Sequence, residues 1–249
     1  MEKDIKDYRG KELKSYVIAN FLAILYGTNF LYKIAELIGG NRDISVIASS
    51  ATFAVFTAVI YIFVFLADAL VPSEIKDKAI WPCGCKPGEK IFTEIREQNE
   101  DNRFSAQHVE RLYADVYASI DAETNENMKK DIQNNNWYYI YKLHENEAQV
   151  CVSQRDSLLC RDLTIITITL FIGFLVLSFI SSTSFSWGTL IFLIVEYVVT
   201  GYLARYKGIR FAYNVIATDI VAKLAEEKSK NRATIAGEGE EYSVIVQRK

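Results

Sequence analysis

Two long stretches without a charged side chain constrain the fold of this 249-residue chain most strongly. One covers residues 44–67 and the other covers residues 163–195. A helix needs about 20 mainly apolar residues to cross the hydrocarbon core of a bilayer, so each stretch is long enough to span one. The net charge of −3 and the charged fraction of 24% are ordinary for a soluble protein, but their uneven distribution predicts a membrane protein instead.

We predict four membrane-spanning helices in two hairpins, beginning with a hairpin over residues 16–71. Its first span covers about residues 16–38 and its second about residues 44–70, with a connection too short to hold a domain. The first span is the weakest, because Lys33 and Glu36 interrupt its apolar pattern near the end. Lys33 can still extend its ammonium group toward the membrane surface.

The second predicted hairpin covers residues 163–204. Its spans, at about 163–181 and 187–204, are joined by a serine-rich turn. Basic residues gather at the opposite ends of the spans: Lys3, Lys6, Arg9, Lys11 and Lys14 precede the first, and Arg205, Lys207 and Arg210 follow the fourth. By the positive-inside rule, both termini and the long middle segment are expected in the cytoplasm. The N-terminal arm does not resemble a cleavable signal peptide.

The predicted fold class is mainly α, with a cytoplasmic domain that is helical or, alternatively, α+β. The expected division is a cytoplasmic arm at 1–15, hairpins at 16–71 and 163–204, the domain at 72–162, and a cytoplasmic helix and tail at 205–249. The domain carries 12 basic and 17 acidic residues, a net charge near −5. This balance argues against binding of double-stranded DNA.

Within the domain, Pro72, Pro82 and Pro87 predict a rigid, non-helical exit from the membrane. Ile91, Phe92 and Ile95 then indicate a short helix. A clearer helix is expected at 105–120, with Ser105 as its N-cap. Its apolar stripe consists of Val109, Leu112, Tyr113, Val116 and Ile120. Residues 121–136 are polar and are expected to form a loop or the start of a helix.

Two interpretations remain for residues 137–152. They could form a β-hairpin with its turn at 144–147, or a long helix that continues into the third span, which we favour because no proline or glycine interrupts it. Beyond the fourth span, an apolar stripe could pair with that helix: Phe211, Val215, Ile216, Ile220 and Leu224. Residues 230–249 could be a tail or one added strand.

Glu196 is the most informative single residue, because it lies inside the fourth predicted span. A charged group there costs about 2.5–3.5 kcal/mol on insertion scales, so it is expected to face a helix bundle, a water-filled cavity or a partner. Glu196, Asn20 and Thr167 are the candidate pore or gate residues. The alternative is a polar anchor between helices, since interhelical hydrogen bonds also retain such residues.

Signals for catalysis or a metal are weak. Cys83 and Cys85 form one Cys-x-Cys pair without a matching second pair, and His108 could join them only through the fold. Cys151 and Cys160 are expected to be free thiols, as is usual in the cytoplasm. No phosphate-binding loop or nucleophile motif is present. We therefore predict no enzyme activity, no cofactor and no bound metal.

A nucleotide-binding interpretation applies to one part of the domain. Guanidinium groups can bind phosphate and aromatic rings can stack on bases. The candidate ligand-binding residues are Lys90, Arg96, Arg103, Arg111, Tyr113 and Tyr117. Because Glu94, Glu97, Glu110 and Asp115 lie among them, ordinary surface ion pairs are the favoured alternative.

Two short hairpins around a cytoplasmic domain resemble the membrane effectors of bacterial antiphage defence, including the four-span channel effector of Hailong-type nucleotide-signalling systems. The resemblance is one of architecture. The segments that suggest it are Lys86-Pro-Gly-Glu, Trp137-Tyr-Tyr-Ile-Tyr, Arg161-Asp162, and Arg210-Phe211 with Val215. It implies an inner-membrane oligomer that stays silent until a nucleotidyltransferase partner makes or withdraws an oligonucleotide signal, and that then permeabilises or depolarises the membrane.

Two functions are therefore expected. The first is a homo-oligomeric effector, with a tetramer favoured, that opens an ion path through the bilayer when its domain senses a nucleotide or protein trigger. The second is a non-conducting membrane-anchored scaffold or sensor that docks a cytoplasmic partner protein.

Overall fold

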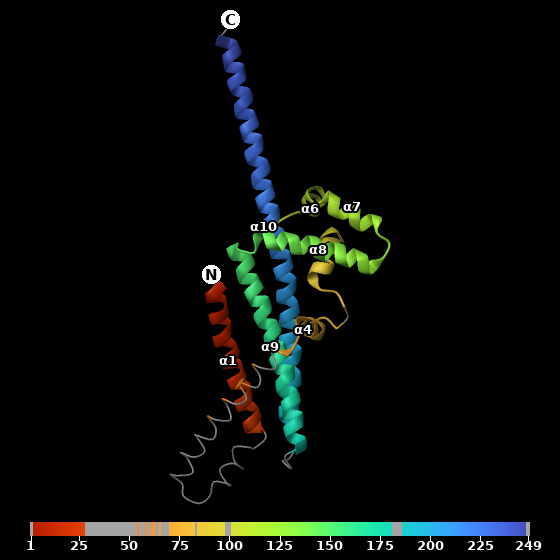
Figure 1. Ribbon diagram of the computed structural model, residues 1–249, viewed down its shortest axis with the longest axis vertical. Coiled ribbons are helices and arrows are strands. Elements are labelled where there is room, and N and C mark those ends of the chain that lie inside the picture. The colour runs from red at the N-terminus through yellow and green to blue at the C-terminus, as the bar shows by residue number, and fades with distance from the viewer. Residues whose placement is uncertain are drawn as a thin grey trace, which may run out of the picture. The chain divides into compact units, whose positions relative to one another are not determined.

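The computed structural model describes residues 2–27, 70–82, 84–97, 101–180 and 186–247, with isolated positions between 54 and 65. The described residues form helices and contain no strand (Figure 1), which confirms the mainly α prediction. The elements are α1 (Glu2–Gly27), α4 (Ser73–Ile80), the 3-10 helix η1 (Pro87–Glu89), α5 (Ile91–Glu97), α6 (Ala106–Leu112), α7 (Ala114–Ala122), α8 (Glu126–His144), α9 (Ala148–Ile180) and α10 (Trp187–Gln247).

The chain divides into two compact units. The first contains Met1–Gly84 and Gln154–Gly208, and the second contains Cys85–Ser153 and Ile209–Lys249. The helices α9 and α10 therefore contribute residues to both units, whereas the remaining helices each belong to one.

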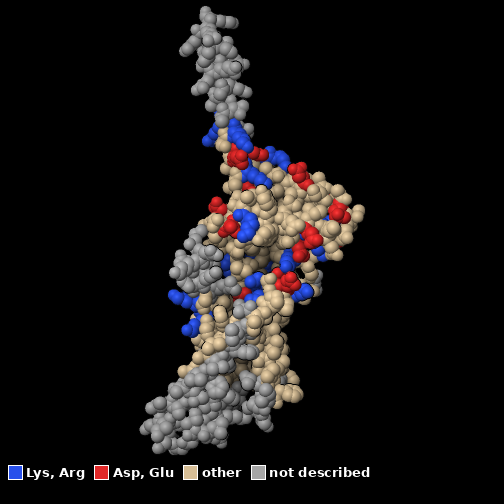
Figure 2. Space-filling view, viewed as in Figure 1, with Lys and Arg blue, Asp and Glu red and all other residues tan. Residues whose placement is uncertain are grey.

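Two helices are long and apolar enough to cross a membrane. The qualifying segments are Ala148–Val176 in α9 and Trp187–Lys230 in α10, and they overlap the predicted third and fourth spans. Figure 2 shows an uncharged surface over the lower parts of these helices. Of the first predicted span, α1 covers the part up to Gly27. The second predicted span, apart from isolated helical positions, and both hairpin turns lie outside the described residues, so the two-hairpin arrangement stays a prediction.

In the first unit, α1, α9 and the first part of α10 pack side by side (Figure 1). Their shared core takes residues from each helix at helical spacing: Val17 and Ile24 from α1, Ile166, Leu170 and Phe174 from α9, and Leu193 from α10. Many other apolar side chains of α10 are exposed, including Ile191, Phe192, Ile194, Val195, Val198 and Val199. An apolar exterior of this kind suits a helix surrounded by lipid.

The predicted non-helical exit at residues 72–87 is wrong in its first half, because α4 begins directly after Pro72. Proline is accepted at the start of a helix, where its missing N–H would have no intrahelical partner. Side chains of α10 bind the last carbonyl groups of α4. Arg205 Nε donates to the carbonyl oxygen of Ile80 at 2.6 Å, and the Tyr197 hydroxyl donates to that of Ala79 at 3.4 Å. Pro72 and Pro82 therefore lie just before and just after a helix.

The core of the second unit contains all three apolar residues of α5, confirming the predicted short helix. The Ser105 cap is also confirmed, since its hydroxyl accepts from the His108 backbone N–H at 3.2 Å. The single helix predicted at 105–120 is wrong, because the backbone turns at Tyr113 and separates α6 from α7. The Tyr113 ring packs in the core there, a tertiary contact that helical periodicity does not reveal.

Residues 137–152 are helical, but the favoured single long helix into the third span is wrong, because α8 ends at His144 and α9 begins at Ala148. The polar segment becomes the start of α8, capped by Asn125, whose side chain accepts from the Asn127 N–H at 2.9 Å. The β-hairpin alternative is wrong, although its proposed turn falls where α8 ends and α9 begins. A helix also replaces the expected tail or strand after residue 230, because α10 continues to Gln247.

The apolar stripe that follows the fourth predicted span is confirmed as a packing face. Val215, Ile216 and Ile220 are almost fully buried, with Phe211 and Leu224 packed against the same cluster. Val150 of α9 belongs to this cluster, so α9 and α10 pair within the second unit as the spacing predicts.

Candidate functional site

Glu196 and Asn20, both predicted pore or gate residues, lie against each other in the first unit. The Asn20 side-chain N–H (Nδ2) donates a hydrogen bond to Glu196 Oε1 at 2.8 Å. Asn20 is only 3% exposed, although it lies in the half-polar α1. The bond links residues 176 positions apart and joins α1 to α10 inside the apolar part of each helix.

Thr167, the third predicted pore or gate residue, lies on α9 and contacts α1 one turn before Asn20. Its hydroxyl donates to the Leu163 carbonyl at 2.9 Å, as threonine often does within helices. The Tyr16 hydroxyl lies 2.7 Å from Thr167 Oγ1. Because the single hydroxyl proton of Thr167 is already used, Tyr16 is the donor in this bond. We call Tyr16, Asn20, Thr167 and Glu196 the polar seam.

Tyr16 is the member of the polar seam that the sequence interpretation missed. The available signal was its spacing, since Tyr16 and Asn20 are four residues apart and therefore share one face of α1. The Asn20 side-chain N–H also donates to the Tyr16 carbonyl at 3.2 Å. The three helices are thus connected by side-chain hydrogen bonds on consecutive turns of α1.

Two oxygen atoms of the polar seam are buried without a hydrogen-bond partner among the described residues. They are Asn20 Oδ1 and Glu196 Oε2. A buried polar atom without a partner costs about 1–3 kcal/mol, more if it is charged. Among the described residues, the polar seam therefore contains hydrogen-bond acceptors without a partner, but no donor without one.

Small side chains lie beside the polar seam where α9 and α10 approach each other. Thr164 is fully buried and Thr200 is 6% exposed. A Cβ placed on Gly201 would lie 4.0 Å from the methyl carbon of Thr164. The Thr200 hydroxyl donates to the Glu196 carbonyl at 2.9 Å. Residues of this size let membrane helices pack closely.

Charged residues of the first unit pair with each other just before the third predicted span. The fully buried Asp162 lies 3.8 Å from Lys76 Nζ and 3.5 Å from Arg161 Nε. Lys207, one of the basic residues after the fourth predicted span, lies 2.9 Å from an Asp156 carboxylate oxygen. These pairs connect α4, α9 and α10 at the end of the predicted spans that is expected to face the cytoplasm.

Every cationic residue of the predicted ligand site forms an ion pair within the second unit. Arg96 donates two hydrogen bonds to Asp121, at 2.8 and 3.2 Å, which lower the pKa of that carboxyl. The remaining pairs are Lys90 with Glu94, Arg103 with Asp101, and Arg111 with Glu227 at 3.1 Å. This arrangement favours the ion-pair alternative, and the nucleotide-binding role stays a prediction.

Tyr113 and Tyr117 are core residues of the second unit. They are 4% and 3% exposed, and each ring packs edge-on against Phe92. The Tyr117 hydroxyl donates to the Phe92 carbonyl at 2.9 Å, and burial raises the pKa of Tyr117 to about 12. The Arg96 guanidinium lies 4.1 Å from the centre of the Tyr117 ring. Neither tyrosine presents an open face on which a base could stack.

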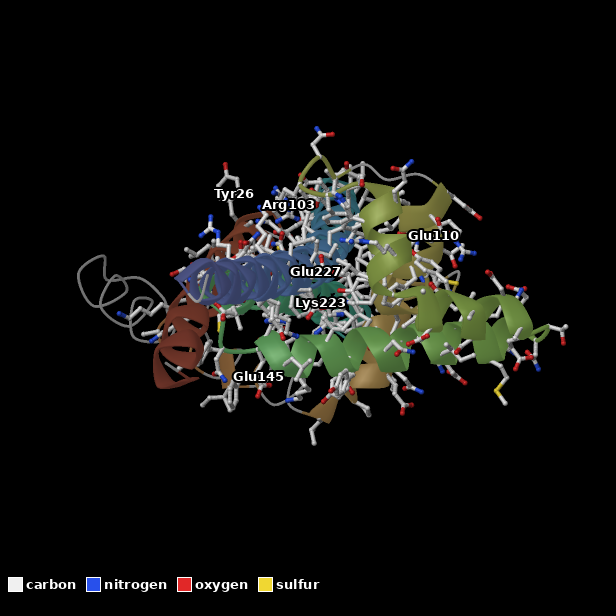
Figure 3. The ribbon with its side chains drawn as sticks, turned by 90° about the horizontal axis from the view of Figure 1, so that it is seen from above. Tyr26, Arg103, Glu110, Glu145, Lys223 and Glu227 are labelled. Carbon is white, nitrogen blue, oxygen red and sulfur yellow. The ribbon has the colours of Figure 1, made fainter. Side chains whose placement is uncertain are left out.

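A buried carboxylate, Asp219, organises the second unit and was not singled out from the sequence. It accepts hydrogen bonds from the Tyr113 hydroxyl, from His144 Nε2 at 2.8 Å and from Lys223 Nζ at 2.9 Å. Burial alone would raise the pKa of Asp219, but the hydrogen bonds from Tyr113, Lys223 and His144 lower it. Lys223 and Glu227, both labelled in Figure 3, are four residues apart on α10. The signal for Asp219 was an acidic residue next to Ile220 in the apolar stripe.

The described residues offer no group of three His, Cys, Asp or Glu side chains that could hold a metal ion. Cys85, Cys151 and Cys160 are free thiols, while Cys83 lies outside the described residues. His108 lies at the start of α6, where its backbone N–H binds the Ser105 cap. The predictions about metal and catalysis therefore stay predictions.

No known protein family, no curated protein and no solved structure matches this chain. The functional argument therefore rests on the residues and their geometry.

Proposed function

We propose that this chain is a four-span protein of the bacterial inner membrane, with both termini in the cytoplasm, whose homo-oligomer opens an ion path when its cytoplasmic domain receives a trigger. The observation that carries the proposal is the Glu196 carboxyl group, hydrogen-bonded to Asn20 within the apolar part of α10. An ionisable residue at that depth costs several kcal/mol, and intramembrane carboxyl groups characteristically mark ion and proton pathways.

An oligomer is proposed because one copy makes a poor conduit. The exposed apolar side chains of α10 between Ile191 and Val199 offer a surface for lipid or for a second copy. A closed ring, with a tetramer favoured, would place one polar seam from each copy around or beside a common axis.

The trigger is proposed to act on the second unit, as the resemblance to antiphage effectors implies. An anionic trigger such as an oligonucleotide would have to replace carboxylates that already pair with the basic residues. Arg111 is the most accessible candidate, because its side chain is 58% exposed in its pair with Glu227. The continuous helices α9 and α10 contribute to both units and would carry the signal.

Ion flux from liposomes that contain the purified full-length protein tests this proposal. The assay compares flux with and without candidate oligonucleotides, for the natural chain and for Glu196→Gln. Trigger-dependent flux that falls in Glu196→Gln is expected. Thr169→Val serves as a control, since among the described residues the Thr169 hydroxyl bonds only to the Ile165 carbonyl of its own helix. Equal flux from the natural chain and Glu196→Gln would contradict the role of Glu196.

A non-conducting scaffold or sensor is the second candidate. The observation that favours it is a set of exposed apolar side chains on α8, where Tyr138, Tyr139 and Leu143 are 51–65% exposed. Exposed apolar groups of this kind can dock a partner protein. A purified oligomer that passes no ions under any trigger, but loses a cytoplasmic partner when Tyr139 and Leu143 are replaced by Ser, would support this function.

A further inference from the structure

The hydrogen bonds of Asn20 and Glu196 can be counted atom by atom. Both protons of the Asn20 side-chain amide are used, one by Glu196 Oε1 and one by the Tyr16 carbonyl. Asn20 Oδ1 and Glu196 Oε2 have no partner among the described residues. Reversing the amide would place its oxygen against two acceptors and is therefore unfavourable. Two acceptors without a partner thus remain, one on each of two groups that already share a hydrogen bond.

We propose that Glu196 is protonated when the ion path is closed, and that it forms a cyclic acid–amide pair with Asn20. In this pair Glu196 Oε2–H donates to Asn20 Oδ1, while Asn20 Nδ2–H donates to Glu196 Oε1. Each group satisfies the other, and no net charge is buried in the apolar region. The inference deepens the proposed function by naming the proton as the ligand of the polar seam.

Within the part of the chain that the structure describes, the surroundings of Glu196 contain no cation that would balance a carboxylate. Among the described residues, no Lys, Arg or His forms an ion pair with it. Facing it are Tyr16 and Asn20 from α1, with Thr167 of α9 bonded to Tyr16. On α10 itself the nearest polar side chain is Thr200, which bonds to the Glu196 backbone carbonyl. Tyr16 is the other titratable group: its hydroxyl lies 2.7 Å from Thr167 Oγ1 and also interacts with the Glu196 carboxyl group.

Loss of the Glu196 proton would open the ion path. When Glu196–COOH gives its proton to water, the products are a carboxylate and hydronium. Glu196 Oε2 and Asn20 Oδ1 then both carry negative partial charge without a hydrogen between them. This repulsion weakens the contact of α1 with α10, and the carboxylate requires water. Opening of the path is thereby coupled to hydration of the polar seam.

Infrared difference spectroscopy of the full-length protein in lipid nanodiscs at neutral pH tests the protonation. A carbonyl stretching band of a protonated carboxylic acid is expected in the natural chain and should be absent in Glu196→Gln. In Asn20→Leu this band should move to higher frequency, because Glu196 Oε1 loses its hydrogen bond. Thr169→Val should leave it in place. Identical spectra of the natural chain and Glu196→Gln in this region would overturn the inference.

Thermal unfolding in the same nanodiscs provides a second readout. Glutamine presents an N–H where the protonated acid has its O–H, so Glu196→Gln should keep the melting temperature, whereas Glu196→Ala should lower it. Equal destabilisation by both variants would overturn the acid–amide pair. A melting temperature that rises with Na⁺ in the natural chain, together with no acid band, would assign the unfilled oxygens to a cation instead.

Failure of this inference and failure of the proposed function are distinguishable. If the acid band is present but no trigger produces flux, the proposed ion conduction is wrong, and the protonated pair only stabilises the contact between α1 and α10. If flux depends on Glu196 but the acid band is absent, the ion path stands and the protonated closed state is wrong.

Discussion

Replacing Tyr113 by Phe tests whether Asp219 organises the second unit. The substitution keeps the ring, its edge-on contact with Phe92 at 5.4 Å between centroids, and its burial. It removes only the hydroxyl that donates to Asp219. The matched control is Tyr117→Phe, an equally buried tyrosine whose hydroxyl donates to a neutral acceptor, the Phe92 carbonyl.

The magnitudes follow from the charge of the acceptor. A hydrogen bond to a charged group contributes about 1.5–3 kcal/mol and one between neutral groups about 0.5–1.5 kcal/mol. His144 and Lys223 still bind Asp219 in Tyr113→Phe, so the carboxylate is not left without partners. We therefore expect Tyr113→Phe to destabilise the second unit by about 1.5–3 kcal/mol, roughly twice the effect of Tyr117→Phe.

Hydrogen–deuterium exchange of the full-length protein, followed by mass spectrometry, measures this difference locally. Peptides from α7 and from α10 after Ile209 should exchange about 10- to 150-fold faster in Tyr113→Phe. The same peptides should exchange about 2- to 10-fold faster in Tyr117→Phe. An effect of Tyr117→Phe equal to or larger than that of Tyr113→Phe would refute the central role of Asp219.

Three further predictions concern single residues. Because the folded-state pKa of Asp219 lies below its ordinary value of 3.8, its stabilising effect is present above that pH and is lost as the pH falls further. Acid-induced unfolding followed by circular dichroism should therefore be less pH-dependent in Asp219→Asn. Thr167→Val, which removes the acceptor of the Tyr16 hydroxyl, should destabilise the protein in nanodiscs by about 0.6–1.7 kcal/mol, and Thr169→Val should change it much less. Gly88→Ala should destabilise the second unit by about 1–3 kcal/mol, because the new Cβ would lie 2.8 Å from Trp137 Cε3. Hydrogen–deuterium exchange of α8 peptides measures this loss, and unchanged exchange rates in α8 would contradict the packing of η1 against it.

The helical class and much of the local structure were predictable from the sequence. The Ser105 cap, the short helix at Ile91 and the buried stripe around Ile216 all follow from patterns within a few residues. Two of the errors share one cause. The break at Tyr113 and the helix after Pro72 depend on side chains that bind partners far along the chain, which local periodicity does not contain.

For the candidate site too, the sequence reveals individual residues but not the contacts between distant ones. Glu196, Asn20 and Thr167 were identified individually, since a polar residue in an apolar segment is visible in the sequence alone. Their arrangement was not, because hydrogen bonds between α1, α9 and α10 join residues more than 150 positions apart. Tyr16 was missed because a tyrosine near the beginning of a membrane span is ordinary.

The sequence by itself determined which segments are apolar, since the cost of burying charge depends on composition and length. It also determined where polar groups interrupt those segments. Only the tertiary structure decided which groups meet: Asn20 with Glu196, Tyr16 with Thr167, and Asp219 with Tyr113, His144 and Lys223. Hydrogen bonds are directional and short-ranged, so the positions of the helices decide which polar residues become partners and which atoms remain unfilled.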